Sequence, residues 1–576
     1  MADNVPATKP YRDDADWWKS TTVYQIYPRS FCDSNGDGIG DIPGIVSKLD
    51  YLADLGIGVI WLSPVYASPM EDNGYDISDY RDIAPEFGTL ADMDRLIAEA
   101  GKRGIGIVMD LVVNHTSDRH EWFEASRASR DNPKRDFYVW RDPAPDGGPP
   151  NDLPSYFAGS AWAFDEATGQ YYMHLFAPGQ PDLNWDNPQL RAEIYDMMNW
   201  WLDRGVAGFR MDVIDLIGKQ PDRLIRNNGP KLHDYLQEMH REALAGRNVL
   251  TVGESWEATP ETGLLFSGRD RDELSMVFQF QHVTSLWGED GNKWRPRPFD
   301  LVTFKRALNE WQRALAEDGW NSLFVSNHDL PRAVSRYGDD RRHWRESATA
   351  IATVNHLMRG TPYVFQGEEI GMTNAGFTQI DQYRDVETLN FHAEHEAAGY
   401  DLAAFLDGAA ANGRDNARTP VQWTAAKNSG FTDGIPWIGV NPNHDRINVD
   451  NQIGDEHSVL AHYRRLIGLR KTHPVVVHGD YVPCLEDNPQ IFAFTRNLGN
   501  RRLAVVVNFS SEPARCDIPA GLETSGVCAI SNYAPRDTIA GTLGLAPWEA
   551  FAVLSETRGQ DPSSGSKSTG TDTAQR

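Results

Sequence analysis

The stretch GFRMDV (208–213) is one of eight short apolar runs that end in polar residues and precede a helix-like segment. The other seven recur along most of the chain: VYQIYPRSF (23–31), VIWLSPV (59–65), IGIVMDLVV (105–113), VLTVGES (249–255), MVFQF (276–280), SLFVSNHD (322–329) and PYVFQGEE (362–369). Strands that alternate with helices predict parallel βαβ units, and eight such units predict an α/β fold, a closed (β/α)8 barrel. In such a barrel, functional side chains gather at the carboxyl ends of the strands.

Two departures from this pattern predict further domains. A polar segment rich in Asp, Pro and aromatic residues separates the third strand from the next helix, and it predicts an inserted subdomain at 112–181. From residue 485 the sequence changes to alternating strands joined by Gly, Asn and Pro turns, which predicts an antiparallel β domain over 485–558. The barrel is then expected at 1–111 and 182–484, and the Ser, Thr and Gly-rich end, 559–576, as a disordered tail.

The composition limits the class of partner. The 576 residues include 82 Asp and Glu against 55 Lys and Arg, a net charge of −27. This field repels nucleic acid and anionic lipid surfaces, so neither is expected as a partner. No secretory signal pattern or bilayer-length apolar run is present, so we expect a soluble cytoplasmic protein, a monomer or small homo-oligomer. The four cysteines lack metal-ligand spacing, and free thiols are expected.

Three carboxylates fall at the ends of predicted strands. Asp212 ends the fourth strand, Glu254 the fifth and Asp329 the seventh, and equivalent ends hold His115 and His328. A single carboxylate there could be a satisfied structural group, but several on one rim would repel each other without a use. A retaining glycosidase uses one carboxylate to attack the anomeric carbon and a second to protonate the departing oxygen. Asp212 and Glu254 fit these two roles.

Arg210 lies two residues before Asp212 and points to the same side of the fourth strand. Its positive charge can hold Asp212 ionised, as a nucleophile requires. Glu254, in contrast, must enter the reaction protonated. The sequence therefore predicts different surroundings for the two carboxyl groups.

With these runs in place, the sequence resembles the α-amylase superfamily of glycoside hydrolases. The four signature regions of this superfamily are matched in order by DLVVNH (110–115), GFRMDV (208–213), GES (253–255) and VSNHD (325–329). The likeness spans residues 13 to about 558. The resemblance implies that Asp212 is the nucleophile, Glu254 the acid/base and Asp329 a third carboxylate that grips the sugar hydroxyls. It also implies an inner shell completed by His115, Arg210 and His328.

Two further runs, EDNGYDISDYR (71–81) and GRDNARTPVQW (413–423), are similar to those of the oligo-1,6-glucosidase and dextran glucosidase group. This likeness implies that Asp72 and Arg414 close the site beyond a terminal glucose, and that Tyr75 stacks on the same ring. The result would be a pocket for exo-acting hydrolysis of a small oligosaccharide. The alternative is ordinary turn chemistry of Asp, Asn and Gly.

The linkage is indicated by residues beside the predicted catalytic pair. QPDLN (180–184) resembles the oligo-1,6-glucosidase version of a fifth signature region, and Val213 stands where α-1,4-preferring relatives tend to have Ala or Thr. Both favour the α-1,6 linkages of isomaltose and isomalto-oligosaccharides. Trp256, Lys293 and Glu387 fall where dextran glucosidases carry groups for the acceptor-side sugars. For Lys293 and Glu387 the alternative is a surface ion pair.

Several related activities remain open from the sequence. Sucrose isomerases share nearly all these regions but carry RLDRD where this chain has TSLWGED (284–290), which favours hydrolysis, although transglycosylation stays open. A maltose- or sucrose-directed α-glucosidase and a trehalose-6-phosphate hydrolase are the other enzymatic alternatives. Transporter heavy chains reuse the fold without catalysis, but they should show a transmembrane helix and often damaged catalytic positions. This chain shows neither feature.

The loop DSNGDGIGD (33–41) indicates a metal site. Carboxylate and amide oxygens recur at alternating positions, and a main-chain carbonyl lies between them; the candidate ligands are Asp33, Asn35, Asp37, Ile39 and Asp41. Hard oxygen ligands at this spacing suit Ca²⁺ or Mg²⁺. The loop resembles the first half of an EF-hand, but Gly44 occupies the position of the bidentate Glu. We therefore expect a structural Ca²⁺, as in dextran glucosidases, with an Asp/Gly turn without metal as the alternative.

Overall fold

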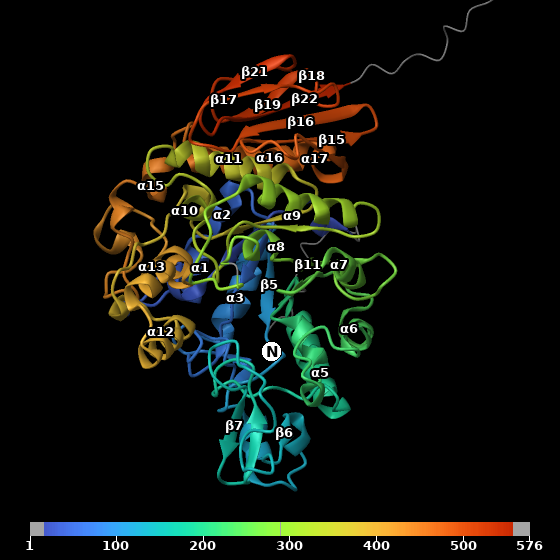
Figure 1. Cartoon of the computed structure of the whole chain (residues 1–576), viewed down its shortest axis with the longest axis vertical. Coiled ribbons are helices and arrows are strands. Elements are labelled where there is room, and N and C mark those ends of the chain that lie inside the picture. The colour runs from blue at the N-terminus through green and yellow to red at the C-terminus, as the bar shows by residue number, and fades with distance from the viewer. Residues whose placement is uncertain (1–15, 289, 557–576) are drawn as a thin grey trace, which may run out of the picture.

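The computed structural model describes residues 16–288 and 290–556, and its centre is an eight-stranded parallel barrel (Figure 1). In sheet order its strands are β1 (Val23–Ile26), β2 (Val59–Leu62), β5 (Gly106–Leu111), β9 (Gly208–Met211), β10 (Leu250–Glu254), β11 (Met276–Phe278), β12 (Ser322–Leu323) and β13 (Thr361–Phe365). A parallel bridge between Val277 and Asn321 joins β11 to the start of β12, so the sheet is nearly closed. Each of the eight predicted runs coincides with one strand to within a residue at its start, and the predicted fold class is confirmed.

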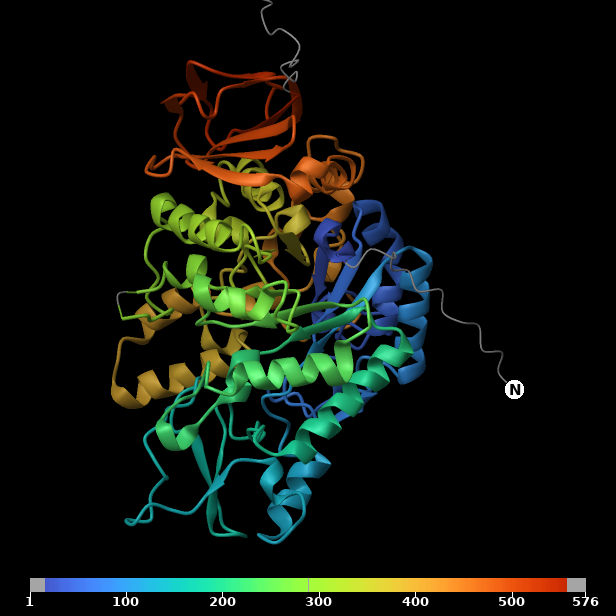
Figure 2. The same cartoon turned by 90° about the vertical axis from the view of Figure 1, so that its right-hand side faces the viewer.

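The strands are buried along their whole length, which explains why they read as continuous apolar runs. The helices around them are amphipathic. In α3 (Leu90–Lys102) the buried positions are Met93, Leu96 and Ala100, and a capping box formed by Thr89 and Asp92 fixes its start. Figure 2 shows the helices packed around the barrel, including the long α5 (Pro188–Arg204).

A subdomain follows the third barrel strand and lies at the lower end of the molecule in Figure 1. It contains α4 (Glu121–Ala128) and a three-stranded antiparallel sheet in the order β6 (Trp140–Arg141), β8 (Gln170–Met173) and β7 (Trp162–Asp165). Its return segment pairs with the segment that follows β5 through the bridge between His115 and Asp182. This pairing holds the subdomain over the carboxyl ends of the barrel strands.

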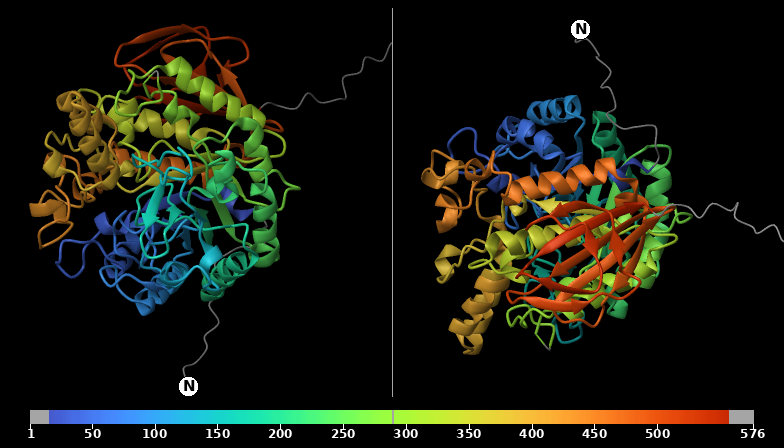
Figure 3. Two further views of the ribbon diagram at one scale, coloured as in Figure 1. Left: turned by 60° about the horizontal axis from the view of Figure 1, so that its bottom comes forward. Right: turned by 90° about the horizontal axis from the view of Figure 1, so that it is seen from above.

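The C-terminal part is an antiparallel sheet with the strand order β14 (Asp480–Cys484), β15 (Ile491–Leu498), β16 (Arg501–Asn508), β22 (Ala550–Glu556) and β19 (Val527–Ser531). It covers α11 (Trp344–Leu357) and α16 (Val459–Thr472), as the right-hand view of Figure 3 shows. Buried Arg496 donates to the carbonyl oxygens of Leu357, Val476 and Gly479, and so ties this sheet to the barrel helices. The predicted tail, 559–576, lies outside the described residues.

Two expectations on the chain as a whole can be compared with the structure. Cys32, Cys484, Cys516 and Cys528 form no disulfide. In the part of the chain that the structure describes, no helix combines the length and the apolar character needed to cross a membrane.

Candidate active site

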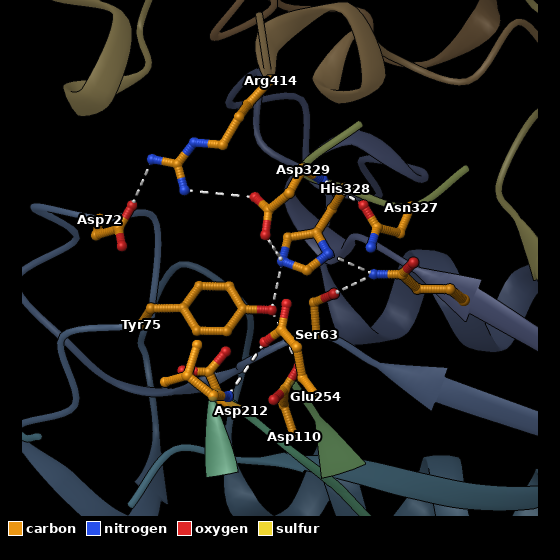
Figure 4. Close-up of polar contacts among 12 residues, drawn as sticks. Ser63, Asp72, Tyr75, Asp110, Asp212, Glu254, Asn327, His328, Asp329 and Arg414 are labelled. Carbon is orange, nitrogen blue, oxygen red and sulfur yellow. Dashed lines mark hydrogen bonds and ion pairs between the residues drawn. The ribbon is translucent and has the colours of Figure 1, made fainter. Parts of the chain in front are cut away.

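A cavity of about 480 Å³ opens at the carboxyl ends of the barrel strands, beneath the subdomain. It is lined by most of the residues that the sequence analysis selected: Asp72, Tyr75, His115, Asp212, Val213, Glu254, Trp256, Lys293, Asp329, Glu387 and Arg414. Arg210 and His328 lie behind this lining and contact it (Figure 4 draws His328 beside Asp329). The structure therefore brings all thirteen residues to one region.

Arg210 binds three carboxylates at once. Its Nη1 contacts Asp212 Oδ1 at 2.7 Å and Asp110 Oδ1 at 2.8 Å, and its Nη2 contacts Glu254 Oε2 at 2.5 Å. Burial raises the pKa of Asp212 well above its usual range, and the negative charges of Glu254 and Asp110 add to the rise while Arg210 opposes it. Burial also raises the pKa of Asp110 to about 6. The Arg210 guanidinium thus forms ion pairs with the two predicted catalytic carboxyl groups, Asp212 and Glu254, and with Asp110 beside them.

Asp110 was not selected from the sequence, although it begins the quoted DLVVNH run. Its Oδ2 accepts hydrogen bonds from Trp61 Nε1 at 3.1 Å and from the Tyr75 hydroxyl at 3.0 Å. Tyr75 is thereby fixed at both its hydroxyl and its ring, because the ring stacks on His328 with a centroid separation of 5.2 Å. The position of Asp110, one residue before the end of the third strand, was the available signal.

His328 connects Tyr75 to the third predicted carboxylate. Its Nδ1 lies 2.8 Å from the Gln25 amide nitrogen, so Nδ1 accepts and Nε2 carries the hydrogen. Nε2 lies 2.6 Å from the Tyr75 hydroxyl and 3.3 Å from Asp329 Oδ2 (Figure 4). Burial lowers the pKa of His328 to about 3, so the imidazole is a neutral donor.

Arg414 closes the inner end of the cavity. Figure 4 shows its guanidinium between Asp72 and Asp329, with Nη2 to Asp72 Oδ1 at 3.1 Å and Nη1 to Asp329 Oδ1 at 3.4 Å. Burial raises the pKa of Asp72 to about 6, although Arg414 opposes the rise. Burial also opposes ionisation of Asp329, but the interaction with the His328 ring and the charges of Arg414 and Arg418 outweigh it and lower the pKa of Asp329.

Two more charged residues complete this inner end and were missed in the sequence. Asp385 Oδ1 accepts a hydrogen bond from Arg414 Nε at 2.8 Å, and Arg418 Nη2 donates to Asp329 Oδ1 at 2.9 Å. Arg418 falls within the quoted run 413–423, one helical turn after Arg414, so its spacing was a usable signal. Asp385 caps the first turn of α12 (Val386–Ala398), and in the sequence it looks like an ordinary N-cap.

His115 lies on the subdomain side of the cavity. Its Nε2 is 3.1 Å from the Tyr75 carbonyl oxygen and 3.3 Å from the Gln180 amide nitrogen, which also donates to Asp72 Oδ2 at 3.3 Å. Burial lowers the pKa of His115 to about 3, so the ring is neutral. Gln180, the first residue of the quoted QPDLN run, thus links the imidazole to the carboxylate at the inner end.

Val213 follows Asp212 in a left-handed conformation, with φ 35° and ψ 45°. A β-branched residue adopts this conformation at a cost, and such strain occurs mainly where surrounding contacts impose it. Here the conformation directs the Val213 N–H to Glu254 Oε2 at 3.1 Å. The side chain still lines the cavity beside the predicted nucleophile.

The outer cavity holds Lys293 and Glu387, whose charged groups are in direct contact. Their side chains are 17% and 12% exposed, so they form a partly buried pair in the cavity wall and not a surface pair. Trp256 lines the same cavity. Its indole Nε1 donates to Glu254 Oε1 at 3.0 Å, and its ring stacks on Phe280 at 3.8 Å.

The predicted metal loop uses its carboxylates in local turns. Asp33 Oδ1 accepts from the N–H groups of Asn35 and Gly36, Asp37 Oδ1 accepts from that of Ile39, and Asp41 caps α1 (Ile42–Ser47). Hydrogen bonds to Asp33 lower its pKa although burial opposes the shift. Within residues 16–288 and 290–556, no three His, Cys, Asp or Glu side chains converge as a group that could hold a metal ion.

Comparison with known proteins agrees with this arrangement. Residues 25–479 match the model of the alpha amylase catalytic domain. A palatinase of Erwinia rhapontici is 54% identical over 94% of this chain and 98% of the relative, and an oligo-1,6-glucosidase of Parageobacillus thermoglucosidasius is 52% identical over 93% and 98%. A crystal structure of Bacillus licheniformis trehalose-6-phosphate hydrolase matches with a TM-score of 0.90 at 43% identity, over 93% of this chain and 99% of that one. A barrel with an acidic cavity at its carboxyl end, matched over nearly the whole chain, means that this protein belongs to the alpha-amylase family of glycoside hydrolases.

Proposed function

We propose that the protein is an exo-acting retaining α-glucosidase that removes terminal α-1,6-linked glucose from isomaltose and isomalto-oligosaccharides. The observation that carries the proposal is the shared contact of Arg210 with Asp212 and Glu254 in a cavity whose inner end is closed by Asp72 and Arg414. The first pair supplies the two carboxyl groups of a double displacement. The pair of Asp72 and Arg414 leaves room for the terminal sugar of an oligosaccharide and not for a sugar inside the oligosaccharide chain.

In the proposed mechanism, Asp212 Oδ attacks the anomeric carbon while the proton of Glu254 moves to the glycosidic oxygen. The carbon–oxygen bond breaks with its electron pair on the leaving sugar, and a glucosyl ester forms on Asp212. Glu254, now a carboxylate, then takes a proton from water, and that water attacks the anomeric carbon and releases Asp212. Two inversions return the α-anomer.

Asp329, His328 and Tyr75 supply the positioning of the terminal glucose in this proposal. Two arginines and a neutral imidazole N–H surround Asp329, so it stays ionised and can accept hydrogen bonds from sugar hydroxyls. Tyr75 offers a ring face that is held in place by its contacts with Asp110 and His328. A pre-positioned group of this kind contributes mainly to the transition state, since it needs no rearrangement during the reaction.

The α-1,6 preference rests on Val213, on the QPDLN run and on the name of an oligo-1,6-glucosidase that is 52% identical. Two similar proteins are named palatinase and trehalose-6-phosphate hydrolase, so the activities in these two names are the alternatives. A phosphorylated sugar is disfavoured by charge, because the cavity lining holds seven carboxylates against three Lys and Arg side chains, and Lys293 already pairs with Glu387.

A side-by-side substrate panel tests the proposal. The purified enzyme is given isomaltose, panose, maltose, sucrose, palatinose and trehalose 6-phosphate, and released glucose is measured as kcat/KM. The highest value is expected for isomaltose or panose. An Asp212→Asn preparation is the control for contaminating activity. A higher kcat/KM for maltose or trehalose 6-phosphate contradicts the linkage assignment, whereas no glucose from any of these sugars contradicts the α-glucosidase itself.

For the 33–41 loop we propose a structural Ca²⁺ held by Asp33, Asn35, Asp37, Asp41 and the Ile39 carbonyl. Support comes from the chemistry of these oxygen donors and from the hydrogen bonds that keep Asp33 ionised. The ion would stabilise the folded state by mass action and takes no part in the proposed reaction. Chelation should lower Tm in the parent and not in Asp37→Ala, and elemental analysis should find calcium only in the parent. An unchanged parent Tm with no metal would leave the turn interpretation.

A further inference from the structure

The two oxygens of Glu254 have different surroundings. Oε2 faces two donors, Arg210 Nη2 at 2.5 Å and the Val213 N–H at 3.1 Å. A protonated oxygen has to donate a hydrogen bond itself, and no acceptor is offered at Oε2 by these two partners. Oε1 contacts only the Trp256 indole N–H, at 3.0 Å, among the hydrogen bonds of the described residues, and Glu254 lines the cavity. Oε1 is therefore the oxygen that can carry the proton toward a bound sugar.

We propose that Trp256 is a positioning residue for the acid/base step, in addition to any role in sugar stacking: its indole N–H holds Glu254 Oε1 toward the leaving oxygen and stabilises the carboxylate formed when the proton departs. This inference rests on the proposed roles of Asp212 and Glu254. An oxygen with two lone pairs can accept the indole N–H with one of them and still hold its proton on the other side. After proton transfer the same contact becomes a hydrogen bond to a charged oxygen, which is the stronger kind.

The position of the indole is fixed by an aromatic stack. The Trp256 ring lies on Phe280 with a centroid separation of 3.8 Å and an interplanar angle of 11°, and Trp287 covers it at 5.8 Å and 28°. Phe280 is fully buried, so the stack has a rigid base. A ring held in this way cannot turn its N–H away from Glu254 without losing the stack.

Other charged groups also face Glu254. Arg210 and Asp212 come from β9 and its end, Asp110 from β5 shares the same guanidinium, and Asp215 comes from η4 (Ile214–Gly218). A variant of Trp256 leaves all of these in place. A change in the pH profile of that variant therefore reports the loss of the indole N–H and not a change of charge.

The test uses leaving groups that need the acid to different degrees. Trp256→Phe keeps an aromatic ring but removes the donor, and kcat/KM is measured for isomaltose and for 2-chloro-4-nitrophenyl α-glucoside, whose anion leaves without protonation. We expect a loss of about tenfold or more for isomaltose, which is part of what acid–base catalysis as a whole contributes, and a far smaller loss for the aryl glucoside. The alkaline limb of kcat/KM should move to higher pH, because the carboxylate loses a hydrogen-bond donor.

Two controls make the result specific. Trp287→Phe trims the same aromatic stack without touching Glu254, so its losses should be alike for the two substrates and its pH profile unchanged. Glu254→Gln gives the limiting dependence on the leaving group. Trp256→Tyr is a second variant without the indole N–H, and circular dichroism checks the fold of each variant.

Equal losses of kcat/KM for the two substrates in Trp256→Phe, or an alkaline limb at an unchanged pH, would overturn the positioning role. Stacking on the sugar would then be the only remaining role of Trp256. Failure of the proposed function is seen separately. In that case the unmodified enzyme would not release glucose from isomaltose, and the same variants would be compared on the disaccharide of the substrate panel that the enzyme does cleave and on the aryl glucoside.

Discussion

Arg414→Met should destabilise the protein in a pH-dependent manner. The Arg414 side chain is 8% exposed and contacts Asp385 at 2.5 Å, Asp72 at 3.1 Å and Asp329 at 3.4 Å. Removing one partner of a buried ion pair costs about 3–5 kcal/mol, because the other charge stays buried. Arg418 still contacts Asp329 and Asp385 after the change, so we expect the lower end, about 3 kcal/mol.

The expected change in melting temperature follows from the size of the chain. With an unfolding entropy of about 2.1 cal/mol/K per residue, 576 residues give about 1.2 kcal/mol/K. A loss of about 3 kcal/mol then lowers Tm by about 2–3 °C if the chain melts cooperatively.

Asp72 sets the direction of the pH dependence. Burial raises its pKa from 3.8 to about 6, and Arg414 is the strongest opposing charge, so its removal raises the value further. The folded state then binds more protons than the unfolded state between the ordinary and the raised pKa, and stability falls as pH rises through that window. In Arg414→Met the window extends above 6, so the deficit should be smaller near pH 5 than near pH 7.5.

Calorimetric melts of Arg414→Met and the parent at the two pH values measure this effect. Arg81→Met is the matched control, because it removes an arginine from an exposed pair in which the Arg81 and Asp196 side chains are 43% and 71% exposed. Such a pair contributes less than about 1 kcal/mol. A Tm loss in Arg414→Met no larger than in Arg81→Met, or an equal deficit at both pH values, would refute the reasoning.

Three further predictions concern catalysis. Asp212→Asn and Glu254→Gln should each lower kcat on isomaltose by about a thousandfold or more while the fold stays intact, since each deletes one step of the double displacement; near-normal turnover in a clean preparation speaks against the assignment. The first glucose released should be the α-anomer, and NMR that finds β-glucose first excludes retention. Val213→Thr should raise kcat/KM for maltose relative to isomaltose by a factor that corresponds to about 1–3 kcal/mol; an unchanged ratio means that Val213 does not select the linkage.

The barrel could be predicted because each strand is a continuous buried run that ends in polar residues. GFRMDV shows why this also located the candidate site: β9 ends at Met211, and the next residue, Asp212, necessarily lies at the carboxyl rim. VSNHD also lies at the carboxyl rim. Its strand, β12, ends at Leu323, and the loop that follows runs along the rim and brings Asp329 to the cavity.

Other parts of the site could not be predicted, because they depend on contacts between distant segments. Asp110 and Tyr75 meet from different elements 35 positions apart, and Asp385 meets Arg414 only because α12 folds back over the cavity. The left-handed backbone of Val213 is imposed by its surroundings, and a β-branched side chain gives no signal for it.

The shared guanidinium also explains how one proton can be kept for the proposed reaction. If Asp110, Asp212 and Glu254 were all ionised, two uncompensated negative charges would be buried around Arg210. Burial raises the pKa of Asp110 to about 6 and that of Asp212 well above its usual range, so burial opposes full ionisation of the cluster. The oxygens of Asp110 are occupied by Arg210, Trp61 and Tyr75, which all donate, and Asp212 faces Arg210 directly. In the proposed mechanism Glu254 Oε1 suits the transfer of a proton to a bound sugar, because Glu254 lines the cavity and the hydrogen bond described at Oε1 comes from the neutral Trp256 indole and not from Arg210.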